Sequence, residues 1–590
     1  MIVRMKKAAV IMQSKDADSA VKELRRLGVL HVEHQQIPKG TDILSLCDDI
    51  ALIQEALSVF SEKEFLVKPC REKQKAPLDW RAAARHVVEA RKRLDQLQEF
   101  SRNLNNRIIE WQPWGDFEPA VIQALAAKNV FVRLYQVPEK EAKGLSAGGI
   151  VKIISTHGGT TYCAVISREK IDIPFKEAAL PRMSLTDMGT RFFEDKKAMQ
   201  DIQDDIRKRA SQRESLINIR NAIEKELEFH KAYRGMGQAG ELTYLAGFIP
   251  VDAQALLLET AAQEKWGIFI NDPSADDNVP TFIRNPQWIS WIQPLLKILE
   301  ILPGYTEFDI SPLFLVFFSL FFGMIIGDAG YGLIYLFLTY LAHRRFGAKM
   351  QDKRIFSLLY LLSSCAIAWG ILTGTFFGQA WLVKYGVHAL LPVLNDPKFI
   401  QGLCFLIGVT HLSLAHLWRF AVQIPSLTAL AELGWVGILW AAFLLVKMLL
   451  LGALFPAWAK YLIIAGISLV VLFSSPRKNI FARIGAGLGT IALSLMNSFG
   501  DIVSYVRLFA VGLAGVAISD AFNSMAAGAV VSGAIGVISA GFILMAGHAL
   551  NFVLSPMSVL VHGVRLNVLE FSGHAGVTWS GTPYKPLSEK

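Results

Sequence analysis

The chain has 590 residues, of which 52% are hydrophobic and 19% are charged, and its formal net charge is +9. A soluble globular protein of this length does not have such a high hydrophobic content together with such a low charged content. The composition therefore excludes a purely soluble protein and predicts a membrane protein. The positive charge does not indicate nucleic acid binding. The cationic residues alternate with acids along helical segments or lie in loops between apolar stretches, where a positive-inside orientation accounts for them.

The charge is distributed unevenly along the chain. Residues 1 to 300 are charge-rich and residues 312 to 571 are mostly apolar, which predicts at least one soluble and one membrane-embedded domain. The amino-terminal stretch lacks a continuous apolar core and a small-residue cleavage site, so we expect no signal peptide and a cytoplasmic amino-terminal half. The five cysteines show neither metal-ligand spacing nor a paired framework, so we expect reduced thiols and no metal or other cofactor.

The soluble half begins with a small α/β unit. MIVRMKKAAVIM and VLHVEH are typical of strands, and SKDADSAVKELRRLG between them is typical of a helix with a serine cap and a terminal glycine. LTYLAGFIPV and KWGIFIND, more than 200 residues later, are expected to complete the same sheet. These segments define a proximal lobe over residues 1 to 40 and 240 to 285.

Two long helical tracts, residues 41 to 112 and 183 to 235, enclose residues 113 to 182, which contain three strand-like runs. We predict an antiparallel coiled-coil arm that carries an α/β distal lobe at its far end. The cytosolic domain, residues 1 to 308, is thus expected to be a two-lobed dumbbell. Its glycine pairs match no phosphate-binding loop and its histidines are scattered, so nothing in this half predicts catalysis.

The apolar half is predicted to cross the bilayer eight times. The first stretch, residues 312 to 342, is divided into two spans at GDAGYG, because one span would place the following basic loop outside the cell. Four further spans are expected near residues 355 to 378, 399 to 422, 428 to 451 and 457 to 474, and two long ones near 484 to 527 and 533 to 572. At about 40 residues each, the last two are too long to cross about 30 Å of hydrocarbon upright. The α-helical membrane domain covers residues 309 to 575, a tail follows at 576 to 590, and both termini are expected in the cytoplasm.

Arg507 lies in the middle of the seventh span, within GDIVSYVRLFAVGLA. A guanidinium keeps its proton at physiological pH, so its burial in an apolar run costs several kcal/mol or more and usually marks an ion path or a counter-charge. Its helical neighbours are small and allow another helix to approach closely. The alternatives are an arginine that reaches the interface, or a structural ion pair with Asp501 or Asp520.

Other polar residues accompany Arg507 in the apolar half. Steps back from Arg565 reach His562, Ser558, Ser555 and Asn551, a stripe that either lines a water-filled half-path or forms interhelical hydrogen bonds. Glu570 is either a partner for Arg565 or a proton relay. Glu432 is either a functional intramembrane acid or a buried partner for Arg419 or Lys447. We expect packing or hydrogen-bonding roles for His411 and His416, and a turn or helix cap at Asp328, with an ion path as its alternative.

Several of these segments together resemble one family. MKKAAVI, ELRRLGVLHVE, FFGMIIGDAGYGLIY, WGILTGTFFG, IGVTHLSLAHLW, GDIVSYVRLFAVGLA and VHGVRLNVLEF resemble the membrane stator subunit of rotary A/V-type ATPases, called subunit I or subunit a. The resemblance runs along nearly the whole chain. Its most diagnostic positions are the arginines of the seventh and eighth helices, here Arg507 and Arg565. The chain departs from many members in lacking a further acid beside these arginines, a place that Asp501 would fill.

The resemblance implies a function. A ring of small proteolipids would rotate past the last two helices, and Arg507 would favour the ionised form of each proteolipid carboxylate, so that its bound proton or sodium ion leaves. Arg565, His562, Asn551 and Glu570 would shape one ion half-path; Asp501, Ser504 and Glu432 are candidates for the other. The chain would perform no nucleotide chemistry, would attach through its soluble domain to peripheral-stalk coiled coils, and would lie in the cell (inner) membrane beside other membrane-sector subunits.

Two other classes of function stay open on the sequence. A secondary transporter would use Arg507 as the site for an anionic solute and predicts internal repeats, which we do not find. A structural anchor would use both arginines as packing ions. The sequence leaves open whether the ion is a proton or sodium, and whether the complex hydrolyses or synthesises ATP.

Overall fold

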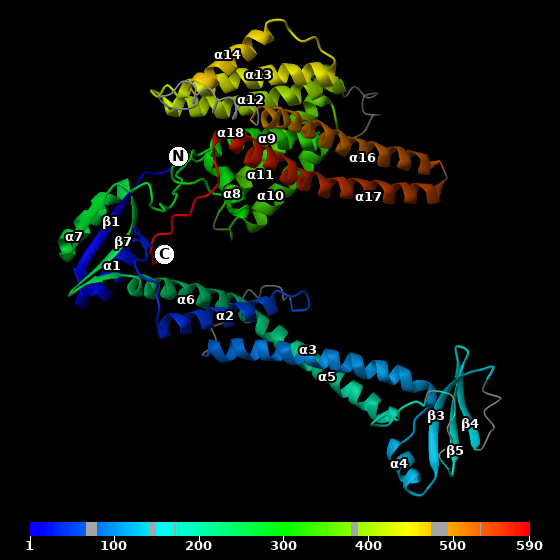
Figure 1. The fold of residues 1–590 in the computed structure, drawn as a ribbon. Coiled ribbons are helices and arrows are strands. Elements are labelled where there is room, and N and C mark those ends of the chain that lie inside the picture. Colours follow the sequence, from blue (N-terminus) through cyan, green and yellow to red (C-terminus); the bar gives the residue numbers. More distant parts are fainter. Residues whose placement is uncertain are drawn as a thin grey trace. The chain divides into compact units, whose positions relative to one another are not determined.

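The computed structural model describes residues 1–589 except 66–78, 142–148, 170–172, 174, 176, 349, 351, 379–387, 474–493 and 532 (Figure 1). The chain forms two compact units. The membrane unit comprises Met1–Ala8, Gly247–Gln263 and Ile268–Pro586, and the arm unit comprises Ala9–Ala246, Glu264–Gly267 and Leu587–Lys590. Part of the basic loop after residue 474 and the start of the seventh predicted span lie outside the described residues, as do Lys349 and Gly148.

The strands predicted at the two ends of the soluble half pair in one sheet. Its order is β2 (His31–Glu33), β7 (Leu242–Pro250), β1 (Met5–Gln13) and β8 (Gly267–Asn271), with β6 (Gly237–Ala239) beside β7. Helix α1 (Ala17–Leu27) ends at Gly28, whose positive φ of 65° and N–H bond to the carbonyl of Leu24 form the glycine stop expected from the sequence.

The serine cap predicted for α1 is wrong. A 3-10 turn, Ser14–Asp16, precedes the helix and makes Asp16 the N-cap residue, which forms no side-chain cap bond. The Ser14 hydroxyl instead donates to the carbonyl of Glu241, 2.9 Å away, because the end of β1 brings it close to the turn before β7.

Four long helices form the arm. α2 (Thr41–Phe60) packs against α6 (Arg213–Arg234), and α3 (Trp80–Trp111) packs against α5 (Leu185–Arg209). Their shared core contains fully buried apolar residues from three of these helices, among them Ile53, Leu94 and Ile206. The second predicted tract is broken by a 3-10 turn at Ala210–Gln212. The coiled-coil form of this packing stays a prediction.

The distal lobe is a three-stranded antiparallel sheet of order β3 (Phe131–Pro138), β5 (Thr160–Ser167) and β4 (Ile150–His157), with α4 (Pro119–Ala127) beside it (Figure 1). The hairpin between β4 and β5 turns at Gly158 and Gly159, both with positive φ, 58° and 78°. A two-residue hairpin turn of type I′ requires positive φ at both central residues, so this glycine pair serves the strand connection.

Most of the membrane unit is helical. After α7 (Gln254–Glu264), η6 (Ile289–Ile292) and α8 (Gln293–Ile298), its helices are α9 (Ser311–Ile326), α10 (Ala329–Phe346), α11 (Arg354–Thr373), η8 (Pro392–Asn395), α12 (Pro397–Gln423), α13 (Ala429–Leu451) and α14 (Ala459–Phe473). A helix over Ser494–Val530 includes α16 (Val506–Val530), and a helix over Ala534–Ala575 includes α17 (Ala534–Ser558) and α18 (Ser572–Ala575). Within the described ranges, five of these helices are long and apolar enough to cross a membrane, and α9 and α14 are shorter apolar helices. Eight spans therefore stay a prediction.

The first apolar stretch divides as the sequence indicates. α9 ends before Gly327, which has a φ of 64°, and the Asp328 carboxylate accepts the N–H bonds of Gly330 and Tyr331 at the start of α10. The predicted cap at Asp328 is confirmed. Its second oxygen accepts the N–H of Gly378, so the same residue also holds the end of the α11 region.

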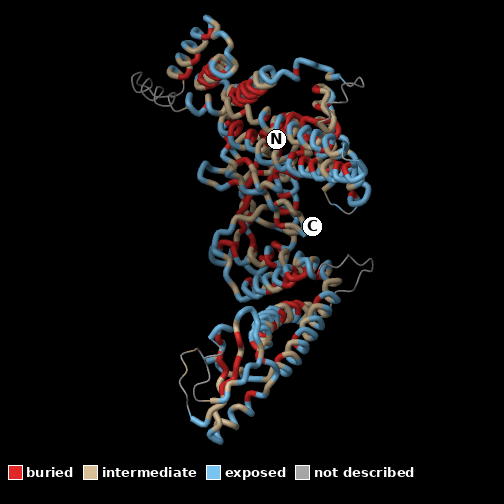
Figure 2. The backbone as a smooth tube through the Cα atoms, turned by 90° about the vertical axis from the view of Figure 1, so that its right-hand side faces the viewer, coloured by how far each residue is buried: buried red, intermediate tan, exposed pale blue. Residues whose placement is uncertain are grey.

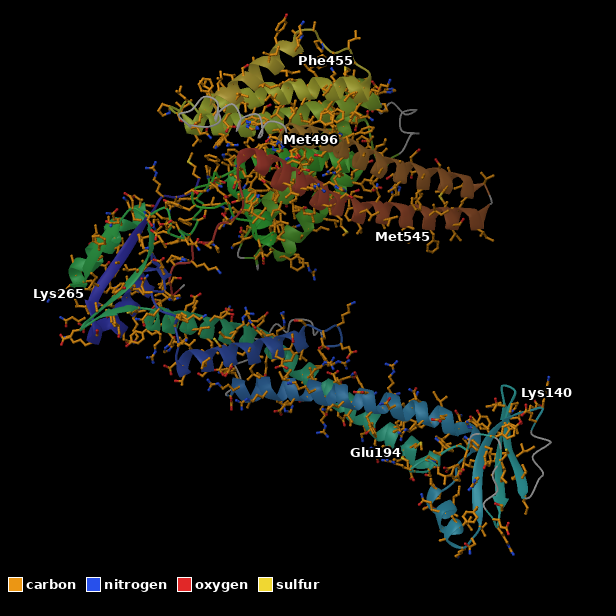
Figure 3. The ribbon with its side chains drawn as sticks, in the orientation of Figure 1. Lys140, Glu194, Lys265, Phe455, Met496 and Met545 are labelled. Carbon is orange, nitrogen blue, oxygen red and sulfur yellow. The ribbon has the colours of Figure 1, made fainter. Side chains whose placement is uncertain are left out.

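α9 lies at the centre of the membrane unit. Phe314, Phe318 and Phe321 are almost fully buried in a core shared with α11, α12, α13 and the two last helices. Figure 2 shows buried residues where elements pack and exposed residues on the outer sides. On α17 the outer side carries large apolar residues, including Ile535, Phe542 and Met545; Met545 is labelled in Figure 3. Such a surface is suited to lipid or to another membrane subunit.

The carboxyl-terminal segment folds back along the residues that precede α9. Within the membrane unit, Thr281 pairs with Pro583, and the N–H of Gly581 donates to the carbonyl of Leu302. The Glu307 carboxylate accepts bonds from the backbone and the hydroxyl of Thr578. The predicted tail after residue 575 thus makes defined backbone contacts.

Candidate functional site

Arg507 lies one residue into α16, just after a local irregularity in the seventh helix. The backbone N–H groups of Tyr505 and Leu508 donate to the carbonyls of Ile502 and Tyr505, which are i to i+3 hydrogen bonds. The Tyr505 side chain is fully buried and forms a 2.8 Å hydrogen bond with His411 Nδ1, which holds the helix at this point. The Arg507 side chain is 22% exposed, and its Nη1 lies 3.8 Å from Glu570 Oε1.

Arg565 lies between two π-helical stretches of the last helix, η9 (Val559–Gly563) and η10 (Leu566–Phe571). Such stretches are rare within helices and are frequent at functional sites. Arg565 Nε is 3.4 Å from Glu570 Oε1, and its side chain is 54% exposed. The π-helical geometry places Arg565 and Glu570 near each other although they are five residues apart.

Glu570 is the shared partner of both arginines. Its side chain is 5% exposed, and Oε1 also receives the Ser504 hydroxyl at 3.4 Å. Among the described residues, neither Glu570 Oε2 nor Arg507 Nη1 has a hydrogen-bond partner. Two guanidiniums face one carboxylate, so this group carries one surplus positive charge next to unsatisfied polar atoms. A buried charge or polar atom lowers the stability of the fold unless another group pairs with it or forms a hydrogen bond to it.

The ion pair that the sequence suggested for Arg507 with Asp501 or Asp520 is wrong, because the described contact of Arg507 is Glu570. Asp501 instead accepts from, or donates to, His574 Nε2 at 3.1 Å. The reason is that Asp501 lies six residues before Arg507, on a different side of the seventh helix. The partnership of Glu570 with Arg565 expected from the sequence is present.

Glu432 belongs to a second polar cluster. Its Oε1 is 2.9 Å from Arg419 Nη2, as one sequence interpretation expected, and its Oε2 is 2.6 Å from His416 Nδ1. His416 Nε2 is in turn 2.9 Å from His574 Nδ1. With the contact of His574 to Asp501, four titratable side chains form one continuous hydrogen-bonded line. His411 lies apart from it, stacked between Phe317 and Phe571 with ring centroids 3.8 and 4.2 Å away.

A cavity of about 320 Å³ lies beside this line. Its wall includes His416, Arg419, Asp501 and His574 from the second cluster, Glu570 from the first, and the polar side chains of Ser494, Asn497 and Ser498. A polar cavity of this size accommodates water, which needs only about 10–15 Å³ and two to four polar partners. The cavity therefore connects the two clusters through a space that water can fill.

The stripe predicted on the last helix divides into two parts. Asn551 is buried and donates to Ser519 Oγ at 2.7 Å and to the carbonyl of Gly515 at 2.9 Å, and Ser555 donates to Asn551 at 3.1 Å. These are interhelical and local hydrogen bonds, one of the two predicted roles. Towards His562 and Arg565 the stripe becomes more exposed. A count of 3.6 residues per turn does not extend through π-helical stretches, whose turns hold more residues.

A third polar group surrounds Ser519. The Tyr331 hydroxyl is 2.9 Å from Ser519 Oγ and 2.7 Å from His548 Nδ1, and His548 Nε2 is 3.2 Å from Asn523 Oδ1. Sequence reasoning did not single out Tyr331 or His574. For His574, the signal was its position four residues after Glu570, one turn further along the same helix.

These features define a class: a multi-pass membrane subunit with a large soluble arm, whose two longest helices present paired arginines to a buried carboxylate. The chain is 32% identical over 620 residues to V-type ATP synthase subunit I of Borreliella burgdorferi, an alignment that covers all of both chains. The chain therefore belongs to the V-type and A-type ATP synthase subunit I family.

Other relatives agree with this assignment. V-type ATP synthase subunit I 1 of Treponema pallidum is 28% identical over the full length of both chains, and A-type ATP synthase subunit I of Pyrococcus horikoshii is 24% identical over 72% of this chain and 65% of its own. No family model matches the chain. The crystal structure of the cytoplasmic N-terminal domain of subunit I, homolog of subunit a, of V-ATPase covers 45% of this chain and 99% of its own at 17% identity. Its TM-score of 0.22 is too low to support an argument.

Proposed function

We propose that this chain is the static ion-conducting subunit of a rotary ATPase, in which Arg507 is the fixed cation that faces a rotating ring of acid-bearing proteolipids. The observation that carries the proposal is the surplus positive charge of Arg507, Arg565 and Glu570 between the two longest apolar helices. A carboxylate supplied by a neighbouring subunit would neutralise this charge and use the unsatisfied Arg507 Nη1.

In this function, each proteolipid carboxylate crosses lipid in a neutral, ion-bound form and loses its ion on reaching Arg507. The guanidinium stabilises the ionised carboxylate electrostatically. Asp501 lines the 320 Å³ cavity, and Glu432 and Ser504 each contact a residue of its wall: Glu432 contacts His416 and Ser504 contacts Glu570. Asn551 lies in the group around Ser519. We assign the first group to one ion half-path and the second to the other, with Arg507 between them as the barrier against a direct leak.

The soluble domain would hold the complex against rotation. A long, charge-laced helical arm with a small sheet at its end is suited to coiled-coil partners of a peripheral stalk. The cytosolic side is assigned to this domain and to the carboxyl terminus by the positive-inside distribution of the loops. On this proposal the chain is a non-catalytic subunit in the cell membrane, and the nucleotide chemistry belongs to other subunits.

The test is Arg507→Ala in the complete complex, assayed in inverted membrane vesicles. We expect ATP-driven ion uptake to vanish while the complex still assembles. Arg344→Ala serves as the matched control, because it removes an exposed arginine from the end of α10 and is expected to retain uptake. Retained uptake in Arg507→Ala would overturn the proposal. Uptake of an anionic solute by the purified chain alone would support a secondary transporter instead.

A further inference from the structure

The number of protons in the hydrogen-bonded line between Glu432 and Asp501 follows from its hydrogen bonds. Three contacts make up the line: Glu432 to His416 at 2.6 Å, His416 to His574 at 2.9 Å, and His574 to Asp501 at 3.1 Å. Each contact requires one proton between its two heavy atoms. Two neutral imidazoles supply only two protons, and ionised carboxylates supply none. The line therefore needs a third proton, on an imidazole or on a carboxyl group.

The charges around the line also favour three protons. Asp501 and Glu432 contribute two negative charges, and Arg419, 2.9 Å from Glu432, contributes one positive charge. With the third proton the group is neutral, and without it a net negative charge remains. His416 and Glu432 are 5% and 7% exposed, so an uncompensated charge there is costly. Among the described residues, the only other charged side chain in the cavity wall is Glu570, whose own partners are Arg507 and Arg565.

The line also provides a way to move this proton. If all three protons shift along their hydrogen bonds in the same direction, the negative charge moves between Glu432 and Asp501 and no atom other than hydrogen changes place. Histidine is suited to this role because each ring nitrogen can accept a proton while the other releases one. His416 and His574 are both bonded through both ring nitrogens, as a relay requires.

The same cavity reaches Glu570, whose Oε2 has no hydrogen-bond partner among the described residues. A proton released at Asp501, which is 31% exposed and lines the cavity, can cross cavity water to this carboxylate, and the return of a proton to Asp501 by the same route restores the line. The line offers sodium a poor site, because hard cations prefer several oxygen ligands, and both Glu432 oxygens and Asp501 Oδ2 are already engaged by histidine or arginine.

We propose that the line Asp501, His574, His416 and Glu432 binds one exchangeable proton and exchanges it with Glu570 across the cavity, so that the transported ion is a proton. This inference rests on the proposed function, because it names the ion of the same path. It assigns His416 and His574 as proton-carrying residues and Arg419 as the residue that positions Glu432 and balances its charge.

The first test needs no variant. Vesicles that contain the complete wild-type complex are energised with ATP in sodium-free medium, and acidification and the uptake of radiolabelled sodium are measured in parallel. We expect ATP-driven acidification without added sodium and no sodium accumulation. ATP-driven sodium accumulation, with no acidification in sodium-free medium, would overturn the proton assignment and leave the stator function intact.

The second test replaces one relay histidine. His574→Gln keeps a side chain of similar size that cannot pass a proton between two faces, and we expect the initial rate of acidification to fall at least 10-fold at equal complex yield. His343→Gln is the matched control, since His343 is an exposed histidine on α10, outside the line, and its variant is expected to pump like wild type. Equal rates in His574→Gln and His343→Gln would overturn the relay. Pumping by Arg507→Ala would instead overturn the proposed function itself.

Discussion

At the scale of single residues, Glu570 matters because it neutralises only part of the charge around it. Its Oε1 lies within 3.8 Å of one nitrogen of both Arg507 and Arg565. The Glu570 carboxylate stabilises the two arginines, each of which can still bind another partner. Because Glu570 already neutralises part of their charge, it also limits how tightly a neighbouring carboxylate can bind to them. On the proposed function, such a site would release each proteolipid carboxylate that it binds, as a rotating contact requires.

Replacing Glu570 by Gln is therefore expected to destabilise the subunit and to stop turnover. The substitution keeps the size of the side chain but leaves two cations without their carboxylate, at a cost of about 1–3 kcal/mol because Arg565 is half exposed. The measurement is the thermal unfolding of the purified complex together with ATP-driven uptake. Glu264→Gln, at an exposed acid at the end of α7, should leave both unchanged, and an equal loss in this control would refute the charge argument.

At the scale of helices, the last two are held together by close approach at glycine. A Cβ at Gly547 on α17 would lie 2.2–2.6 Å from Phe522 Cγ, Cβ and Cδ1 on α16, whereas a Cβ at Gly541, also on α17, meets no atom within 4 Å. The two glycines differ in packing and not in helix propensity, so they separate the two effects.

Gly547→Ala is expected to force the two helices apart and to cost about 1–3 kcal/mol of stability, as overpacking does in well-packed interfaces. Gly541→Ala, on the same helix, should be neutral or slightly stabilising, because alanine is the better helix former. Thermal unfolding and ATP-driven uptake of the complete complex provide the comparison. If both variants behave alike, the helices are not held by contact at Gly547.

The helices also show what the sequence can and cannot predict. The break at Gly327 and Asp328 was predictable, because glycine adopts the positive φ that ends a helix and the aspartate side chain caps the residues that directly follow it. The contact of Asp501 with His574 was not predictable, because it joins two helices. In addition, a π-helical stretch precedes His574, and there the spacing of 3.6 residues per turn does not hold. Arg419 and Glu432 lie near the adjoining ends of the consecutive helices α12 and α13, so their pairing could be expected from the sequence. His574, which joins that cluster through His416, is more than 140 residues from Glu432, so its place there could be seen only in the fold.

At the scale of the whole molecule, the carboxyl-terminal segment and the residues before α9 stabilise each other through Glu307. Burial alone would raise the pKa of Glu307, but hydrogen bonds from Thr578 and Gly304 outweigh it and hold the pKa below its usual value. A lowered pKa means that the ionised form is favoured in the folded state. The stabilisation is therefore fully present above the usual glutamic acid pKa of about 4.3 and is lost as the pH falls through the lowered pKa.

Thr578→Val should weaken this junction by about 1 kcal/mol at neutral pH, because it removes one hydrogen bond to Glu307 while keeping the side-chain shape. It should also raise the pKa of Glu307 towards its usual value. Hydrogen exchange of residues 577 to 584 at neutral and acidic pH measures both effects. Thr582→Val makes the same chemical change at an exposed threonine and should leave exchange unaltered. A similar increase in exchange for both variants would contradict the role of Glu307.

The 320 Å³ cavity also bears on how the membrane voltage acts on this subunit. On the proposed function, water in the cavity would carry the electrical potential of one side of the membrane inward to Glu570 and would leave the potential drop to the protein around Arg507. A unit charge that crosses this dry layer exchanges about 2.3 kcal/mol per 100 mV with the membrane potential. The subunit would thus concentrate the voltage around Arg507, and substitutions that narrow the cavity should change the voltage dependence of turnover before they change its maximal rate.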